Sequence, residues 1–159
     1  MTVTVRAATL EDLPAIKAVG EATWPTTYAF AGAEYIEHGL ATWWSESALA
    51  RSLRETVVRV GCLDEQIVGV GTLDLRGEFP VIWKMYVLPT AQGSGVGSAV
   101  LEALLAEAPP GRGPIRLEYI EGNEPAAAFY RARGFVELRR DPGEQPGWPA
   151  QVWMQRDIG

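Results

Sequence analysis

The chain has 159 residues, of which 47% are hydrophobic and 21% charged, and its formal net charge is −6 at pH 7. This length and composition predict one globular domain, spanning residues 1–159, with a sizeable apolar core. Nucleic acids and anionic membranes are not expected as partners, because proteins bind both through basic surfaces.

The first half of the chain is predicted to begin with a strand and to continue as helices. Its elements, in chain order, are a strand over 2–9, a helix over 10–24, a loop over 25–32 and a helical region over 33–55. The strand alternates and is rich in Val and Thr, and Thr9 is placed to cap the helix that follows. The last region has the pattern of two short helices, with a break near Gly39 or Ser45.

The second half alternates strands with two helices. Its predicted elements are strands over 56–64, 66–76 and 79–88, a helix over 96–108, a strand over 114–121, a helix over 123–133, and strands over 135–140 and 150–157. Asp64 and Glu65 join the first two strands as a hairpin. Gly69 and Gly71 indicate a bulge or the close approach of another backbone. The element order predicts an α/β fold: one domain with a mixed central sheet of six to seven strands, flanked by about four helices.

The chain has one cysteine, Cys62, and one histidine, His38. A lone cysteine excludes an internal disulfide, and its apolar setting predicts a buried structural thiol. No metal is expected, because one cysteine and one histidine cannot form a zinc site of the Cys/His type. His38 lies in a helical pattern and is interpreted as a surface or interface residue. With no bilayer-long apolar run and no signal-peptide pattern at the start, a cytoplasmic protein is expected.

Three glycines, Gly93, Gly95 and Gly97, lie between a predicted strand and a predicted helix. A helix N-terminus carries unpaired N–H groups and a partial positive charge, and glycines let a ligand approach them closely. The junction therefore predicts a site for a phosphate or pyrophosphate. A P-loop is excluded because no Gly-Lys-Ser/Thr follows. A dinucleotide fingerprint is a weaker alternative, since the spacing is Gly-x-Gly-x-Gly, although Glu118 lies about where its acid would be.

The residues Gln92-Gly93-Ser94-Gly95-Val96-Gly97 match the Gln/Arg-x-x-Gly-x-Gly/Ala motif of the GNAT superfamily of N-acetyltransferases. The segment "LEYIEGNEPAAAFYRARGF" resembles the block that follows this motif in the family, with Asn123, Tyr130 and Gly134-Phe135 at its spacings. The opening "TVRAATLEDLPAIKAV" and the later "ATWPTTY" are also similar to the family. The resemblance covers nearly the whole chain and implies a GNAT-like fold.

The resemblance further implies acetyl-CoA as the acyl-donor cosubstrate and an amine as the acceptor. Residues that would hold acetyl-CoA are Met85, Tyr86 and Val87 through their backbone, Gln92, Gly93, Ser94, Gly95, Val96, Gly97 and Ser98 around the pyrophosphate, and Asn123 at the pantetheine. The chain departs from the family in two ways. Position 92 is Gln rather than Arg, and Trp83 and Lys84 stand where many members have an acid.

Glu118 is the candidate general base, because it occupies the place where the ribosomal-protein alanine acetyltransferase branch keeps its base. A carboxylate on an interior strand face can have a raised pKa that suits it to this task. The alternative is a salt bridge to Arg116 or Lys84. If Glu118 is not the base, the next candidates for this role are Tyr28, Glu34 and water.

Tyr130 is the candidate general acid for the departing CoA thiolate, since the resemblance aims this side of its helix at the sulfur. It follows Asn123 by seven residues, two helical turns, so both point to the same side. The alternative is that Tyr130 and Phe129 only pack the helix on the sheet, with the Tyr130 hydroxyl bonded to backbone.

The acceptor amine, of a small molecule or a peptide, stays open, as does the formation of a homodimer. Trp24 and Tyr28 are the candidate substrate-binding residues. They belong to a set of aromatic residues that line an apolar pocket or belong to the core: Trp24, Tyr28, Tyr35, Trp43, Trp44 and Trp148. Two other functions are retained as alternatives. One is a catalytically silent acyl-CoA-binding sensor or structural module, and the other is a nucleotide-dependent oxidoreductase.

Overall fold

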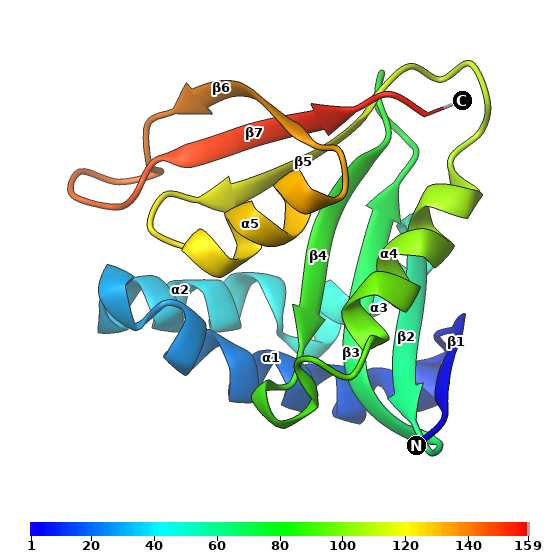
Figure 1. The fold of residues 1–159 in the computed structure, drawn as a ribbon. Helices are drawn as coiled ribbons and strands as arrows, with labels where there is room; N and C mark the ends of the chain where they lie inside the picture. The colour runs from blue at the N-terminus through cyan, green and yellow to red at the C-terminus, as the bar shows by residue number, and fades with distance from the viewer. Residues whose placement is uncertain (159) are drawn as a thin grey trace.

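A computed structural model describes residues 1–158 as a seven-stranded mixed sheet with helices on both faces (Figure 1). The strand order is β1-β2-β3-β4-β5-β7-β6, and only β4 and β5 pair in parallel. The strands are β1 (Val3–Ala7), β2 (Val57–Leu63), β3 (Gln66–Asp74), β4 (Val81–Val87), β5 (Ile115–Ile120), β6 (Val136–Asp141) and β7 (Gln151–Arg156). The predicted mixed α/β sheet is confirmed.

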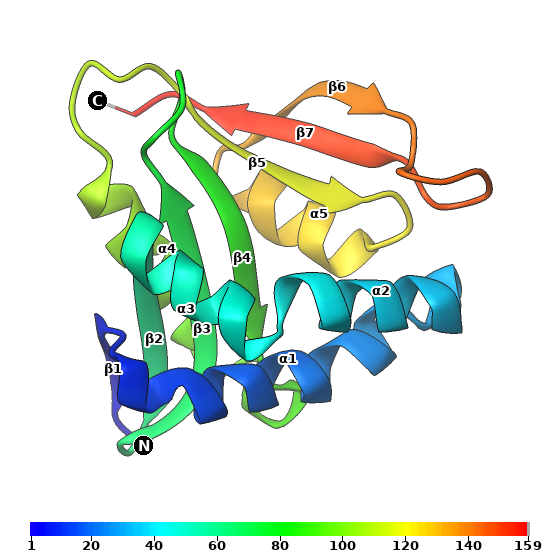
Figure 2. The same cartoon turned by 180° about the vertical axis from the view of Figure 1, so that it is seen from behind.

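The helices divide between the two faces of the sheet. They are α1 (Leu13–Thr27), α2 (Ala33–Trp43), α3 (Glu46–Glu55), α4 (Val96–Glu107) and α5 (Glu124–Ala132), with single 3₁₀ turns at Leu10–Asp12, Ala29–Ala31 and Pro89–Ala91. Helices α4 and α5 cover one face (Figure 1), and α1, α2 and α3 cover the other (Figure 2). Within residues 1–158, no helix has the length and apolar character needed to cross a bilayer.

Two helix boundaries are set by local contacts. The region 33–55 breaks at Ser45, one of the two predicted positions, because its hydroxyl caps α3 by accepting the Ala48 N–H at 3.2 Å. Helix α1 continues to Thr27, so the loop predicted from Pro25 onwards was wrong in its first residues. Pro25 costs one N–H donor, but the next turn keeps the bond from the Tyr28 N–H to the Trp24 carbonyl at 2.9 Å. The buried rings of Trp24 and Tyr28, whose centroids are 4.4 Å apart, pack against each other and hold that turn in place.

The predicted hairpin is present, with β2 and β3 joined through Asp64 and Glu65 at φ +48° and +75°, the backbone of a tight turn between twisted strands. The prediction of a bulge or a backbone contact is confirmed at Gly69: the β2–β3 pairing skips Val68 beside it, and a Cβ on Gly69 would lie 3.2 Å from the Tyr86 carbonyl oxygen. At Gly71 the close neighbours are side chains instead. A Cβ on Gly71 would lie 2.7 Å from a Val100 methyl group. The missing side chain therefore lets side chains of α4 pack directly on the sheet.

A further bulge lies in β4, at Trp83. Thr72 pairs with Lys84 and Leu73 pairs with Ile82, so Trp83 has no partner on β3. The extra residue changes which face each side chain takes. Ile82 belongs to the core under α4, whereas the Lys84 ammonium and the Tyr86 ring lie against Trp44 on the side of α1–α3.

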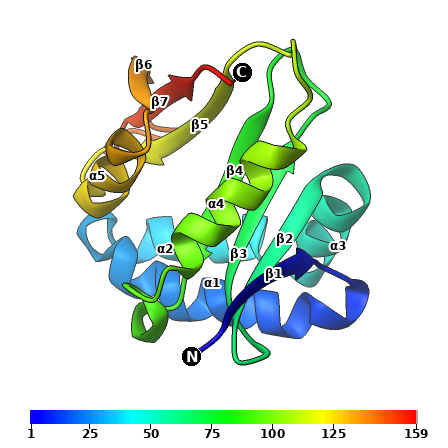
Figure 3. The ribbon, with the colours of Figure 1, turned by 45° about the vertical axis from the view of Figure 1, so that its right-hand side comes forward.

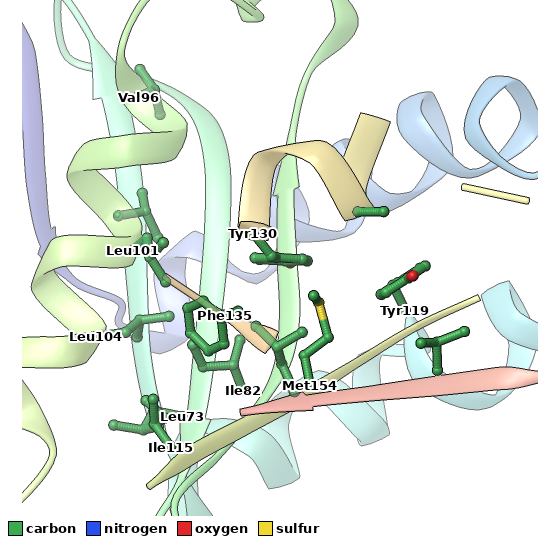
Figure 4. Packing of buried hydrophobic residues seen from close by; sticks show 14 of the residues in the cluster. Leu73, Ile82, Val96, Leu101, Leu104, Ile115, Tyr119, Tyr130, Phe135 and Met154 are labelled. Atoms are coloured by element: carbon green, nitrogen blue, oxygen red, sulfur yellow. The ribbon is translucent and has the colours of Figure 1, made fainter. Parts of the chain in front are cut away.

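The bulge marks the point where β4 and β5 separate. The two strands pair only at Val81 with Arg116 and at Ile82 with Leu117, and then diverge (Figures 1 and 3). An apolar cluster fills the closed end of this joint (Figure 4), including Leu73, Ile82, Ile115, Phe135 and Met154. The open end leaves one edge of β4 without a strand partner.

Candidate functional site

Two cavities border the open end of the joint between β4 and β5. The first, called here the aromatic cavity, has a volume of about 900 Å³ and lies between the sheet and α1–α3. The second, called the glycine-loop cleft, has a volume of about 730 Å³ and lies between β4, the start of α4, and α5. Trp24, Tyr28, Lys84 and Glu118 border the first, and Gly95, Ser98, Asn123 and Tyr130 border the second. Among residues 1–158, Tyr86 alone borders both.

The glycine loop has the predicted strand, loop and helix arrangement. Gly93 and Gly95 have φ +83° and +94°, and Gly95 is the N-cap of α4. Gly97 serves packing, since a Cβ there would lie 3.4 Å from the Phe129 ring. The first bond of the helix runs from the Ala99 N–H to the Gly95 carbonyl. The N–H groups of Gly97 and Ser98 therefore have no acceptor within the helix, and they lie at its positive end.

Arg133 adds a positive charge to the same loop, which sequence reasoning missed. Its guanidinium lies 3.6 Å over the Phe129 ring and donates to Ser98 Oγ at 2.6 Å. Gln92 instead donates to the Val87 carbonyl at 3.4 Å. The charge absent from position 92 is thus supplied from the residue that follows α5. The sequence signal for this was weak, because it depends on how α5 packs against α4.

Most of the residues predicted to hold the cofactor border the glycine-loop cleft. They are Met85, Tyr86, Val87, Gln92, Gly93, Gly95, Gly97, Ser98 and Asn123. Ser94 and Val96 do not border it. The Ser94 hydroxyl donates to the Ala91 carbonyl, and the Val96 side chain is fully buried in the core. Asn123 also caps α5, accepting the Ala126 N–H at 3.4 Å.

Two tyrosine hydroxyls meet where the cavities adjoin. The Tyr28 and Tyr86 oxygens are 2.8 Å apart. Burial raises the pKa of both phenols above the ordinary value, so both stay protonated and neither suits the role of base. Glu34 is exposed and borders neither cavity. The predicted aromatic set does gather around the aromatic cavity: Trp24, Tyr28, Tyr35, Trp43, Trp44 and Trp148 all border it.

Glu118 borders the aromatic cavity from β5. Burial raises the pKa of its carboxyl to about 7, and the charges of Glu144 and Asp141 act in the same direction. No salt bridge from Glu118 to Arg116 or Lys84 occurs within residues 1–158, so that alternative is not supported. The carboxyl therefore changes protonation near neutral pH and faces the space on the α1–α3 side.

Tyr130 borders the glycine-loop cleft from α5 and is 7% exposed. Burial raises the pKa of its phenol well above the ordinary value, so it stays protonated. Its ring packs as the alternative interpretation expected, 5.7 Å from Phe135 (Figure 4). Its hydroxyl, however, has no hydrogen bond to the backbone within residues 1–158. Glu118 and Tyr130 thus lie in different cavities, with Tyr86 between them.

Comparison with known proteins places this arrangement in a family. Residues 54–137, more than half of the chain, match the acetyltransferase (GNAT) domain. The chain belongs to the GNAT acetyltransferase family. The matched segment runs from the end of α3 into β6, so it contains the glycine loop, Glu118 and Tyr130, but not α1 or α2.

Solved structures share the fold over almost the whole length of this acetyltransferase. PaiA N-acetyltransferase from Thermoplasma acidophilum, in complex with coenzyme A, is 20% identical with a TM-score of 0.83, covering 99% of this chain and 100% of the other. A GCN5-related N-acetyltransferase from Rhodopseudomonas palustris is 24% identical with a TM-score of 0.84, covering 99% and 97%. The ribosomal-protein-S18-alanine N-acetyltransferase from Escherichia coli is 21% identical with a TM-score of 0.78, covering 99% and 95%.

The single histidine and cysteine of this GNAT acetyltransferase lie outside the junction of the cavities. His38 is at the rim of the aromatic cavity, where its Nε2 lies 3.5 Å from a Glu144 oxygen. It is partly exposed, broadly as predicted. Cys62 is 2% exposed within β2, which confirms the prediction of a buried thiol.

Proposed function

We propose that this protein transfers an acetyl group from acetyl-CoA to the amine of a small molecule or peptide, by direct attack of the amine on the thioester. The observation that carries the proposal is the meeting of the two cavities at Tyr86. A donor held in the glycine-loop cleft and an acceptor held in the aromatic cavity would approach each other there. Holding two reactants in the correct relative orientation can lower the activation free energy by about 7–11 kcal/mol.

The glycine-loop cleft suits acetyl-CoA, which supplies the activated acyl group when bound. The N–H groups of Gly97 and Ser98, together with the Arg133 guanidinium, would hold the pyrophosphate. The unpartnered edge of β4 at Met85–Val87 offers backbone N–H and C=O groups to the amides of the pantetheine arm. The coenzyme A bound to the Thermoplasma relative supports this choice.

The protein's own part in the chemistry is to move two protons. The alkylammonium of an acceptor must lose a proton before it can attack, since its pKa is about 10.4. Glu118, placed in the aromatic cavity, would accept that proton directly or through water. Tyr130, protonated and placed in the cleft, would donate to the departing sulfur. One group faces each reactant, so no covalent enzyme intermediate is required.

The proposal is tested by following thiol release from acetyl-CoA with a panel of amines, alongside calorimetric titration of coenzyme A. Amine-dependent thiol release supports it. Binding of coenzyme A without turnover on any amine would favour the silent acyl-CoA-binding module. Binding of NAD without coenzyme A would favour the oxidoreductase.

Substitution of Glu118 should change the pH dependence of the reaction. In the wild type kcat/KM is expected to rise as pH passes about 7, because the carboxyl then loses its proton and can serve as a base. Glu118→Gln should remove the inflection near pH 7 and leave a rise that continues towards the pKa of the amine, because only free amine then reacts, and it should lower kcat by about 10²-fold near pH 7. Steady-state kinetics from pH 5.5 to 9.5 measure both effects.

Glu144→Gln is the matched comparison for this prediction. Removing the Glu144 charge removes one cause of the raised Glu118 pKa, so the rise in kcat/KM should move to lower pH. A wild-type kcat in Glu118→Gln at every pH would place the base elsewhere.

A further inference from the structure

The aromatic cavity contains a buried cation without an acidic partner. Lys84 is 8% exposed, and its ammonium lies 5.2 Å from the Trp44 ring centroid. Within residues 1–158 this ammonium makes no ion pair and no hydrogen bond to protein. Burial alone lowers its pKa, to about 8. At neutral pH the side chain therefore stays mostly charged in a place that penalises charge.

The other charged groups that border the cavity are mostly paired. The Arg76 guanidinium contacts the Asp74 carboxylate at 2.9 Å and the Glu55 carboxylate at 2.6 Å, and Glu144 lies beside His38 at its rim. Arg51 is exposed at the border. This leaves one acid, Glu118, and one buried cation, Lys84, that are not paired with each other.

The β4 bulge sets where this cation lies. It turns Lys84 to the same side as Tyr86, two residues further along the strand. Two residues of a strand span about 6.6–6.8 Å along the backbone, and the side chains of Lys84 and Tyr86 both border the aromatic cavity. Aromatic side chains, including Trp24 and Tyr35, wall the same cavity.

We infer that Lys84 binds the carboxylate of the acceptor, which is therefore a small amino acid with an apolar or aromatic body. This inference rests on the proposed function and names its substrate class. A carboxylate gives the Lys84 ammonium the charge-assisted partner that the protein does not supply, while the amine of the same molecule lies toward Glu118. A polyamine would place a second ammonium beside Lys84, and that like-charge contact disfavours it.

Matched acceptors that differ only in the carboxylate test the inference. The standard amino acids are compared with their decarboxylated amines, such as phenylalanine with phenethylamine and tyrosine with tyramine, and with spermidine. 2-Aminoethylphosphonate shows whether another anionic group replaces the carboxylate. In the wild type, kcat/KM should be higher for at least one amino acid than for its decarboxylated amine and for spermidine.

Lys84→Met keeps the length of the side chain and removes its charge. It should lower kcat/KM for the preferred amino acid by about 10- to 100-fold, mainly through KM, and should change the decarboxylated amine little. Lys84→Arg should keep the preference. Arg54→Met removes a positive charge from α3 that borders neither cavity, and it should leave the preference unchanged. Lys84 does not border the glycine-loop cleft, so the affinity for coenzyme A reports that each variant is folded.

Three outcomes overturn the inference. They are a wild-type preference for spermidine or for the decarboxylated amines, an equal effect of Lys84→Met on both members of each pair, and a preference for the phosphonate over every amino acid. In each case thiol release still occurs, so the proposed acetyl transfer stands. Absence of thiol release with every amine is a failure of the proposed function itself, and the inference falls with it.

Discussion

Gly95→Val is expected to weaken the binding of coenzyme A sharply while the chain remains folded. Gly95 caps α4 at φ +94°, and no protein atom lies within 4 Å of a Cβ placed there. That open space is where the N–H groups of Gly97 and Ser98 would meet a pyrophosphate. A branched side chain would fill it and shift the loop. Loss of two charge-assisted bonds corresponds to a Kd raised about 10²-fold or more, measured by calorimetry.

The backbone cost of this substitution needs a control, because a non-glycine residue in the left-handed region costs roughly 1–2 kcal/mol wherever it lies. Gly111 is suitable: it has φ +82°, it also has no atom within 4 Å of a Cβ, and it borders neither cavity. Gly111→Val should lower the unfolding temperature by a similar amount and leave the affinity for coenzyme A unchanged. Wild-type affinity in folded Gly95→Val would refute the assignment of the loop.

Tyr130→Phe is expected to lower kcat by about 10²–10⁴-fold with little change in the affinity for coenzyme A. The ring stays, so its packing against Phe129 and Phe135 is kept, and only the hydroxyl is lost. Burial holds this phenol protonated. The same burial would raise the pKa of a thiol leaving in the cleft, so a nearby proton donor would matter more than in water. Turnover on the preferred amine, with a separate titration of coenzyme A, measures the two effects.

Tyr28→Phe gives the comparison for this variant. The Tyr28 hydroxyl is also buried at the junction, but it is bonded to Tyr86 at 2.8 Å, and we expect a smaller loss of kcat. An equal loss in both variants would indicate that the tyrosines act together rather than through Tyr130. Wild-type turnover in Tyr130→Phe would leave this residue with a packing role only.

The elements that local patterns encode could be predicted from the sequence. Asp64 and Glu65 between alternating strands indicate a hairpin, and Gly93 to Gly97 before an amphipathic segment indicate a loop opening a helix. What depends on contacts across the fold could not. The β4 bulge lies in "VIWKMYV", which has no glycine or proline, and exists only through the pairing with Thr72 and Leu73.

The same limit applies to the candidate site. Motif spacing and the family resemblance predicted half of the residues that border the glycine-loop cleft, mainly those that are neighbours in the chain between Met85 and Ser98. Arg133 escaped notice because its position over Ser98 depends on the docking of α5. The division of Glu118 and Tyr130 between two cavities could not be foreseen, since it follows from the separation of β4 and β5 after two residue pairs.

The β4 bulge also determines which changes in chain length this strand can absorb. Trp83 and Lys84 both lie on the side of the aromatic cavity, so a deletion of Trp83 restores regular alternation without moving Lys84, Tyr86 or Met85 to the opposite face. A deletion of Met85 would instead exchange the faces of the residues on one side of it. Position 83 is thus the place where β4 can be shortened by one residue while the remaining side chains of the strand keep their faces, toward the aromatic cavity or toward α4.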